Sequence, residues 1–242
     1  MLSRLVLLFT LAVFARGADK PDNRRLPVRP PAKARVLFDG SGLGQWTEYH
    51  NYLDNFQPSG VSSGHFRLVA GGAMEIDTGD RPKDSQCYLA TREQFGDIRR
   101  LHVEFLIPTP APNDNDQLRG NSGVYLQGRY EVQILESYAR PVSNTGCGAL
   151  YKIFAPRVNA SLPPDRWQSF DIRFQAARIE AGKVIRPARI TVRHNGIEIH
   201  HDAELNVPST QRFTTDRQNS RGPIVLQHHW CPVRFRNIWI EE

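Results

Sequence analysis

The stretch from Tyr125 to Ile134 concentrates side chains that can do chemistry. Its odd positions are mostly polar and its even positions mostly apolar, which is typical of a strand with one face on a core. Long hydrogen-bonding groups beside Tyr125 and Tyr130 favour a sugar-binding cleft over a plain solvated surface. The groups on this polar face are Gln127, Arg129, Glu131 and Gln133.

A turn within this stretch would change which residues share a face. If Gly128-Arg129 forms a two-residue turn, the alternation of polar and apolar side chains starts anew after it. Only Tyr130 to Leu135 then keep the pattern described above. Glu131 and Gln133 lie on one face in both cases, because they are two residues apart.

Two carboxylates, Glu131 and Glu136, resemble part of the E-x-D-x-x-E signature of retaining glycosidases. Retaining hydrolysis needs two carboxyl groups about 5–5.5 Å apart across the scissile bond. Gln133 stands where that signature has its central Asp, which weakens the comparison. A two-carboxylate hydrolase stays open as an alternative.

Strand-like alternation recurs along the chain, whereas no helical periodicity extends beyond about two turns. Asn195-Gly196 lies between two alternating runs and predicts a tight hairpin. We therefore predict an all-β, concanavalin-like jelly-roll sandwich of two antiparallel sheets, with a closed barrel as the minor alternative. The clearest predicted strands are 101–107, 170–174, 190–192, 197–199, 222–227 and 233–240.

The composition of the 242 residues, 40% apolar and 23% charged, excludes a wholly disordered chain. The net charge of +6 belongs to the N-terminal part, because Lys and Arg balance Asp and Glu from Val36 to Glu242. A nucleic-acid partner is therefore not expected.

The N-terminal residues have the pattern of an export signal. We expect residues 1–17 to be a signal peptide cleaved near Gly17-Ala18, which makes the protein periplasmic or secreted. Their apolar run is too short to span a bilayer, and no later run is longer. Residues 18–34 are interpreted as a Pro/Arg-rich linker, and residues 35–242 as the catalytic domain.

Cys87, Cys147 and Cys231 are too few and too widely spaced for a disulfide framework. Either one bridge or three buried free thiols fits this spacing. Residues 113–116, Asn-Asp-Asn-Asp, resemble a fragment of a calcium loop but lack its later Gly and Glu, so we interpret them as a polar surface loop.

The chain resembles the DUF1080 family, also called the 3-keto-disaccharide hydrolase domain, in order from about Val36 to Glu242. The motifs that carry this resemblance are Leu37-Phe38-Asp39-Gly40 with Leu43 and Trp46, Gly120 to Leu126, Tyr130 to Leu135, Gly148-Ala149-Leu150-Tyr151, Trp167 to Arg173, Asn195-Gly196, Gly222-Pro223-Ile224 and Arg234 to Ile240. The resemblance implies a jelly roll and an exported enzyme that acts on glycosides oxidised at C3.

A ketone at C3 acidifies the hydrogen on C2, so the glycosidic bond at C1 can break by elimination and water can then add to the enone. Such a site needs a base and a proton donor but no nucleophilic carboxylate pair. We assign Glu131 as the base and Gln133 as its orienting partner. Tyr125 and Gln227 are candidate substrate ligands.

Histidine is the other candidate acid/base. His229 matches a histidine of the family's Gln-Asp-His-Gly segment, which makes it a candidate acid/base or ligand of a divalent cation. This chain departs from that segment at His228, Trp230 and Cys231. The other histidines, His50, His65, His102, His194, His200 and His201, are interpreted as structural or surface residues.

Three cations could stabilise a developing enolate: Arg129, Lys152 and Arg234. A surface salt bridge, or packing of the aliphatic part of the side chain, would account for each of these cations equally well. Two functions without this chemistry also stay open: a non-catalytic carbohydrate-binding module and an interaction domain.

Overall fold

The computed structural model describes residues 21–50, 65–79, 87–109, 115–207 and 220–242. Within these residues the chain is all-β, with fifteen strands, one 3₁₀ helix η1 (Asp116–Leu118) and no α-helix. No helix in these ranges is long and apolar enough to cross a membrane. The predicted fold class is confirmed, because the described strands form separate antiparallel sheets that do not close into a barrel.

One sheet of the sandwich has five strands among the described residues, and it carries the polar residues identified above. Every neighbouring pair in it is antiparallel. Its order is β2 (Trp46–His50), β5 (Cys87–Thr91), β14 (Val225–His228), β7 (Ser122–Leu126) and β8 (Tyr130–Ile134).

The second sheet has eight strands in the described part of the chain. Its order is β13 (Ile197–Leu205), β12 (Ala188–His194), β9 (Trp167–Gln175), β6 (Ile98–Leu106), β15 (Arg234–Glu241), β4 (Ala73–Ile76) and β3 (Phe66–Val69), with β1 (Arg35–Phe38) paired to β15. A separate ribbon consists of β10 (Arg178–Glu180) and β11 (Lys183–Arg186).

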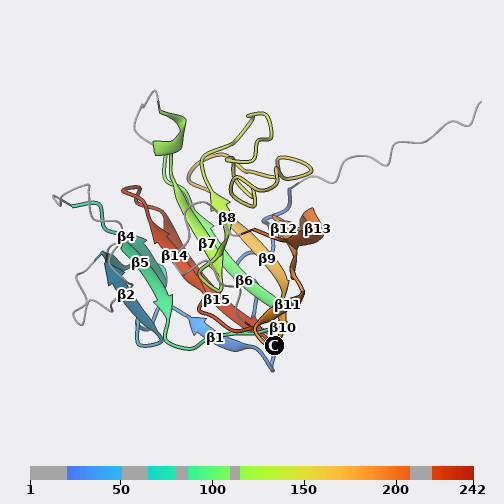
Figure 1. The fold of residues 1–242 in the computed structure, drawn as a ribbon. Helices are drawn as coiled ribbons and strands as arrows, with labels where there is room; N and C mark the ends of the chain where they lie inside the picture. The colour runs from blue at the N-terminus through green and yellow to red at the C-terminus, as the bar shows by residue number, and fades with distance from the viewer. Residues whose placement is uncertain (1–20, 51–64, 80–86, 110–114, 208–219) are drawn as a thin grey trace, which may run out of the picture.

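The core lies between the two sheets (Figure 1). Alternate residues of β6 and β9, among them Phe105 and Phe170, meet there with Val132 and Ile134 of β8. Burial of these apolar side chains is the main force that holds the sheets together. The hairpin predicted at Asn195-Gly196 is confirmed, since it joins β12 to β13.

Residues 21–34 form no strand or helix, but they are attached to the sandwich rather than free of it. The Asn23 side chain donates to the carbonyl oxygen of Trp167 over 3.0 Å. The backbone N–H of Val28 donates to Glu104 Oε1 over 2.8 Å, and Asn237 Nδ2 donates to the Val28 carbonyl over 2.8 Å. The described part of the segment interpreted as a linker therefore lies against the eight-stranded sheet. The predicted signal peptide, residues 1–17, lies outside the described residues.

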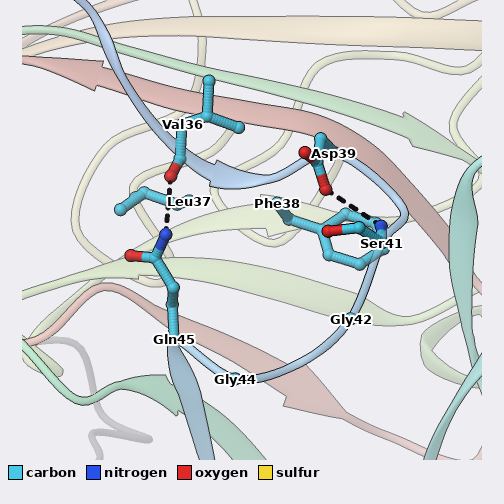
Figure 2. Close-up of a pocket in the computed structure, with 8 residues that line it drawn as sticks. All are labelled: Val36, Leu37, Phe38, Asp39, Ser41, Gly42, Gly44 and Gln45. Atoms are coloured by element: carbon cyan, nitrogen blue, oxygen red, sulfur yellow. Dashed lines mark hydrogen bonds between the residues drawn. The ribbon is translucent and has the colours of Figure 1, made fainter.

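The motif Leu37-Phe38-Asp39-Gly40 leads into a tight loop before β2 (Figure 2). Gly40 has a φ of +92°, and a Cβ there would lie 2.8 Å from the backbone carbonyl carbon of Gly72. Ser41 N–H donates to Asp39 Oδ1, and Gln45 Nε2 donates to the carbonyl of Val36. The loop and the end of β1 line a hollow of about 290 Å³ between Val36 and Gln45, and none of the candidate site residues lines it.

All three cysteines are buried, and the described residues contain no disulfide bond. Of the two alternatives left open by their spacing, the structure confirms buried thiols.

Candidate active site

The chemistry-bearing stretch is a hairpin, so the prediction of one continuous strand is wrong. Gln127 (φ 54°) and Gly128 (φ 63°) are the two turn residues between β7 and β8, and Arg129 N–H donates to the carbonyl of Leu126 over 3.0 Å. Two successive positive φ values fit a type I′ turn. The alternative of a two-residue turn is correct in kind, but the turn lies one residue earlier. As a result, Tyr125 and Glu131 are direct cross-strand partners.

Glu131 and Gln133 share the outer face of the five-stranded sheet, as predicted from their spacing. Val132 and Ile134, which alternate with them, belong to the core between the sheets. Tyr125 of β7 lies on the outer face too, where it packs with Tyr88 of β5; their ring centroids are 6.1 Å apart. All of these side chains are buried. The outer face is therefore a covered, polar and aromatic layer.

Gly123 provides the space into which the Glu131 side chain extends. It pairs with Gln133 across the hairpin. A Cβ at Gly123 would overlap Glu131 Oε1 and lie 2.9 Å from Glu131 Cγ. Any other residue at position 123 would therefore displace the carboxyl group.

Hydrogen bonds hold the carboxyl group from two sides. Gln227 Nε2 of β14 donates to the Tyr125 hydroxyl oxygen over 3.1 Å, so the phenolic proton of Tyr125 is free to donate to Glu131. With its NH₂ group turned toward Glu131, Gln133 donates to Glu131 Oε1 over 3.0 Å and to the Ser122 carbonyl over 3.0 Å. Gln227, Tyr125, Glu131 and Gln133 thus form one polar chain across three strands.

Burial raises the pKa of Glu131 to about 8, and the hydrogen bond from Tyr125 offsets only part of that rise. Desolvation penalises the charged form of a carboxyl group, which is the physical cause. A carboxyl group with a pKa near physiological pH can both take up and release a proton at that pH. This property suits a general acid or base.

A short segment extends the sheet beyond β8. Gly148 N–H donates to the Gln133 carbonyl, Gln133 N–H donates to the Ala149 carbonyl, and Tyr151 N–H donates to the Glu131 carbonyl, over 2.8, 2.9 and 3.0 Å. Tyr151 therefore flanks Glu131 on the side opposite Tyr125. The next residue, Lys152, is exposed, with Nζ 5.4 Å from the Tyr151 ring centroid.

The other two candidate cations have different surroundings. Arg129, at the hairpin end, is buried with its guanidinium carbon 5.8 Å from the ring centroid of Tyr130, a core residue. Arg234 lies on β15 of the other sheet, where its Nε is 2.6 Å from Glu75 Oε2. Of the three predicted cations, Lys152 is the one beside a neighbour of Glu131.

Glu136 has surroundings different from those of Glu131, because its carboxylate contacts two arginines. Arg119 Nη2 is 2.9 Å and Arg140 Nε is 3.7 Å from Glu136 Oε2, and Tyr138 N–H donates to Glu136 Oε1 over 3.0 Å. Glu136 also lies beyond β8, which ends at Ile134, so the strand does not hold it on the face that carries Glu131. Ion pairs with two arginines do not match the carboxylate pair across a scissile bond that retaining hydrolysis needs.

The two neighbouring histidines lie in different surroundings. His228, the last residue of β14, is buried, with Nε2 3.1 Å from the Asp77 carbonyl oxygen and its ring centroid 5.3 Å from that of His65. His229 follows the end of β14 and is half-buried. Burial lowers the pKa of His229, and its Nδ1 has no hydrogen-bond partner among the described residues.

The described residues contain no group of three His, Cys, Asp or Glu side chains that could hold a metal ion. In the loop compared with a calcium site, Asn115 Oδ1 caps η1 by accepting from Gln117 N–H, and Asp116 pairs with Arg140 over 2.7 Å. Asn113 and Asp114 lie outside the described residues. The donors in the described part of the chain do not fit the divalent cation considered from the sequence.

Sequence reasoning assigned no role to Gly123, Tyr88 or Tyr151. Each becomes part of the site only through pairing between strands, which local alternation does not reveal. The one local signal is that Gly123 and Tyr151 both stand in motifs shared with the family.

The family model for the 3-keto-alpha-glucoside-1,2-lyase-like domain matches residues 33–241. The chain belongs to this family. Among solved structures, a glycosyl-hydrolase-like protein from Parabacteroides distasonis ATCC 8503 is 30% identical, with a TM-score of 0.70 over 88% of this chain and 85% of that one. A second such protein from the same organism is 14% identical, with a TM-score of 0.59 over 86% and 92% of the two chains, and shares the fold. A search of curated proteins finds no match.

This family member is thus a carbohydrate-active, glycosyl-hydrolase-like domain with a jelly-roll fold. Membership indicates an enzyme with a sugar substrate. The row of Tyr125, Glu131 and Tyr151, with Gln133 and Gln227, is its candidate active site.

Proposed function

We propose that this protein cleaves glycosides that carry a ketone at C3, by elimination across C1–C2 followed by hydration of the enone. The observation that carries the proposal is Glu131, a buried carboxyl group with its pKa raised to about 8 and held by neutral hydrogen-bond donors. A single poised base of this kind suits abstraction of an acidic C–H.

In the first step, Glu131 takes the proton from C2, and the electron pair delocalises into the C3 carbonyl as an enolate. Tyr125 and Gln133 keep the carboxylate in one orientation by donating to it. The electron pair then forms the C1=C2 double bond while the C1–O bond breaks. The alcohol leaves, and the sugar becomes an enone.

We assign the positioning of the substrate to Gln227 and Lys152. Gln227 Oε1 is buried and has no hydrogen-bond partner among the described residues, so it can accept from a sugar hydroxyl. Buried polar atoms usually have partners, and one without a partner beside a candidate base fits a substrate contact. Lys152, exposed next to Tyr151, supplies positive charge at the edge of the site.

The alternative retaining hydrolase is not favoured, because Glu136 is paired with Arg119 and Arg140 instead of facing Glu131. A carbohydrate-binding module would use the same covered face but would not need a carboxyl group with a raised pKa.

The test is to incubate the pure protein with a 3-keto disaccharide and with its unoxidised parent in deuterated water. We expect release of the free keto sugar from the first alone, with deuterium incorporated at C2 during turnover. Equal cleavage of both sugars would favour the hydrolase. Binding without cleavage of either would favour a binding module.

We also propose that the protein acts outside the cytoplasm, on the basis of the signal pattern in residues 1–17. N-terminal sequencing of the mature protein, isolated from the cell envelope or the medium, should give a start near Ala18. An intact Met1 on that protein would contradict export by cleavage.

A further inference from the structure

Tyr151 lies beside Glu131 on the side opposite Tyr125, where its backbone N–H donates to the Glu131 carbonyl over 3.0 Å. The backbone bridge between Val132 and Leu150 puts both of those residues in the core, so their neighbours Glu131 and Tyr151 share the outer face. Residues opposite each other on adjacent strands have Cβ atoms about 4.5–5.5 Å apart. The Tyr151 ring therefore stands beside the Glu131 side chain.

The two flanking tyrosines differ in how their hydroxyl groups are used. The Tyr125 hydroxyl accepts from Gln227 and donates to Glu131, which occupies its one proton. The Tyr151 hydroxyl has no hydrogen-bond partner among the described residues. Tyr151 is also 8% exposed, whereas Tyr125 is fully buried. Tyr151 can thus donate to a substrate without breaking a bond inside the protein.

The charge of Glu131 couples the two groups. Burial and the nearby Glu131 carboxylate both raise the pKa of Tyr151, so the phenol keeps its proton at neutral pH. Once Glu131 has taken up a proton and become neutral, that repulsion is gone and Tyr151 gives up its proton more readily. Proton uptake at one group therefore promotes proton release at the other.

We propose that Tyr151 is the general acid that protonates the departing glycosidic oxygen in the elimination proposed above. The proposal rests on that function. When the C1–O bond breaks, the leaving oxygen takes the phenolic proton, so an alcohol departs and Tyr151 is left as phenolate. Glu131 holds the proton from C2.

Hydration restores both groups. The Tyr151 phenolate takes a proton from water as its oxygen adds to C1, and protonated Glu131 returns a proton to C2. The bonds formed are C1–O and C2–H, the C1=C2 double bond is lost, and no redox partner is needed. One pair of residues thus serves both half-reactions with their roles exchanged.

The test compares wild type and Tyr151→Phe on two 3-keto glucosides, one with a sugar aglycone and one with 4-nitrophenol. Nitrophenolate leaves without protonation, whereas a sugar alkoxide does not. We expect Tyr151→Phe to lose about 10²–10⁴-fold in kcat with the sugar aglycone but less than about threefold with nitrophenol. With the sugar aglycone, deuterium exchange at C2 should continue and outrun cleavage.

Two matched variants distinguish proton donation by Tyr151 from an indirect effect on Glu131 or on the fold. Tyr125→Phe should slow both aglycones alike and slow C2 exchange, because it acts through Glu131. Tyr138→Phe, at an exposed tyrosine outside the row, should match wild type. A common melting temperature shows that all variants fold.

An equal loss on both aglycones for Tyr151→Phe, or full activity on both, would overturn the role of Tyr151. If the wild-type protein cleaves neither 3-keto glucoside, the proposed function is wrong, and the role of Tyr151 is then wrong as well.

Discussion

Two buried glutamates, one on the outer face of each sheet, have pKa values shifted in opposite directions. Glu104 on β6 receives hydrogen bonds from Arg236 Nε and Asn237 Nδ2, each over 2.7 Å, and lies 3.4 Å from His102 Nε2. Burial opposes its charged form, but the bonds from His102, Asn237 and Arg236 outweigh burial and lower the pKa of Glu104. For Glu131, burial prevails and the pKa rises to about 8.

The comparison shows that the balance between burial and charged neighbours decides what a buried carboxyl group can do. Glu104 is held in its charged form, and its hydrogen bond with the Val28 N–H attaches the segment around Val28 to the eight-stranded sheet. Glu131 is held by amide and phenol groups, so its proton can come and go near neutral pH. A protein keeps such a group at a cost in stability, which favours a catalytic role.

The largest expected effect is on activity at Glu131. Glu131→Gln keeps size and most hydrogen bonding but removes the base, so kcat on a 3-keto substrate should fall about 10²–10⁴-fold. Because the variant has no carboxyl group to ionise in a buried site, it should also melt no lower than wild type. Steady-state kinetics and calorimetry at pH 8 check both expectations. Near-wild-type kcat would remove Glu131 from the mechanism and leave His229 as the candidate base.

Next in size is the stability effect at Glu104. Glu104→Ala leaves Arg236 without its carboxylate partner, although His102 keeps its contact with Asp171, and breaking a buried ion pair costs about 3–5 kcal/mol of unfolding free energy. Denaturant unfolding measures this loss. The protein that remains folded should keep its kcat, since Glu104 lies on the other sheet. A fall in kcat as large as that of Glu131→Gln would break the division between an anchoring and a catalytic glutamate.

Local sequence patterns predicted strands and their faces better than they predicted turns and strand partners. Alternation placed β6, β9 and the β12–β13 hairpin, and it put Glu131 and Gln133 on one face, because period-two arguments need only neighbouring residues. It missed the hairpin turn at Gln127-Gly128, since no Asn or Asp marks the first turn position. It also could not assign Arg234 to a sheet, because alternation gives a face but not a partner strand.

The residues that complete the site came from pairing between distant segments. Tyr151 reaches Glu131 through an isolated bridge, and Gly123 matters only because a side chain from the next strand lies over it. Residues 21–34 are attached by scattered single hydrogen bonds, among them those of Val28 with Glu104 and Asn237, which no composition bias signals.

The third effect concerns pH and has opposite signs at the two glutamates. The free base form of Glu131 grows as pH rises through about 8, so kcat/KM should rise about tenfold per unit below that pH and level off above it. The folded pKa of Glu131 exceeds that of the unfolded chain, so its contribution to stability is lost as pH rises from the unfolded pKa to about 8, and the loss levels off above that pH.

Glu104 has the reverse linkage. Its folded pKa is lowered, so its contribution to stability is present above the unfolded pKa and is lost as pH falls through the folded one. Melting temperatures of Glu131→Gln and Glu104→Gln, each relative to wild type, should therefore diverge with pH. The advantage of Glu131→Gln should grow toward high pH, and the deficit of Glu104→Gln should shrink toward low pH. Parallel curves would mean that the two sites do not differ as described.

The smallest expected effect is at Glu136, the third carboxylate, which tests whether Glu131 works alone. Glu136 resembles Glu104 in having cationic partners, because Arg119 and Arg140 approach the same oxygen. Glu136→Gln should lower stability modestly and change kcat less than about threefold, since the group is held in ion pairs and has no part in elimination. In a two-carboxylate hydrolase the same change would cost as much as Glu131→Gln, because nucleophile and acid are both essential there. Measuring kcat for the two variants on one 3-keto substrate therefore decides between one active carboxylate and two.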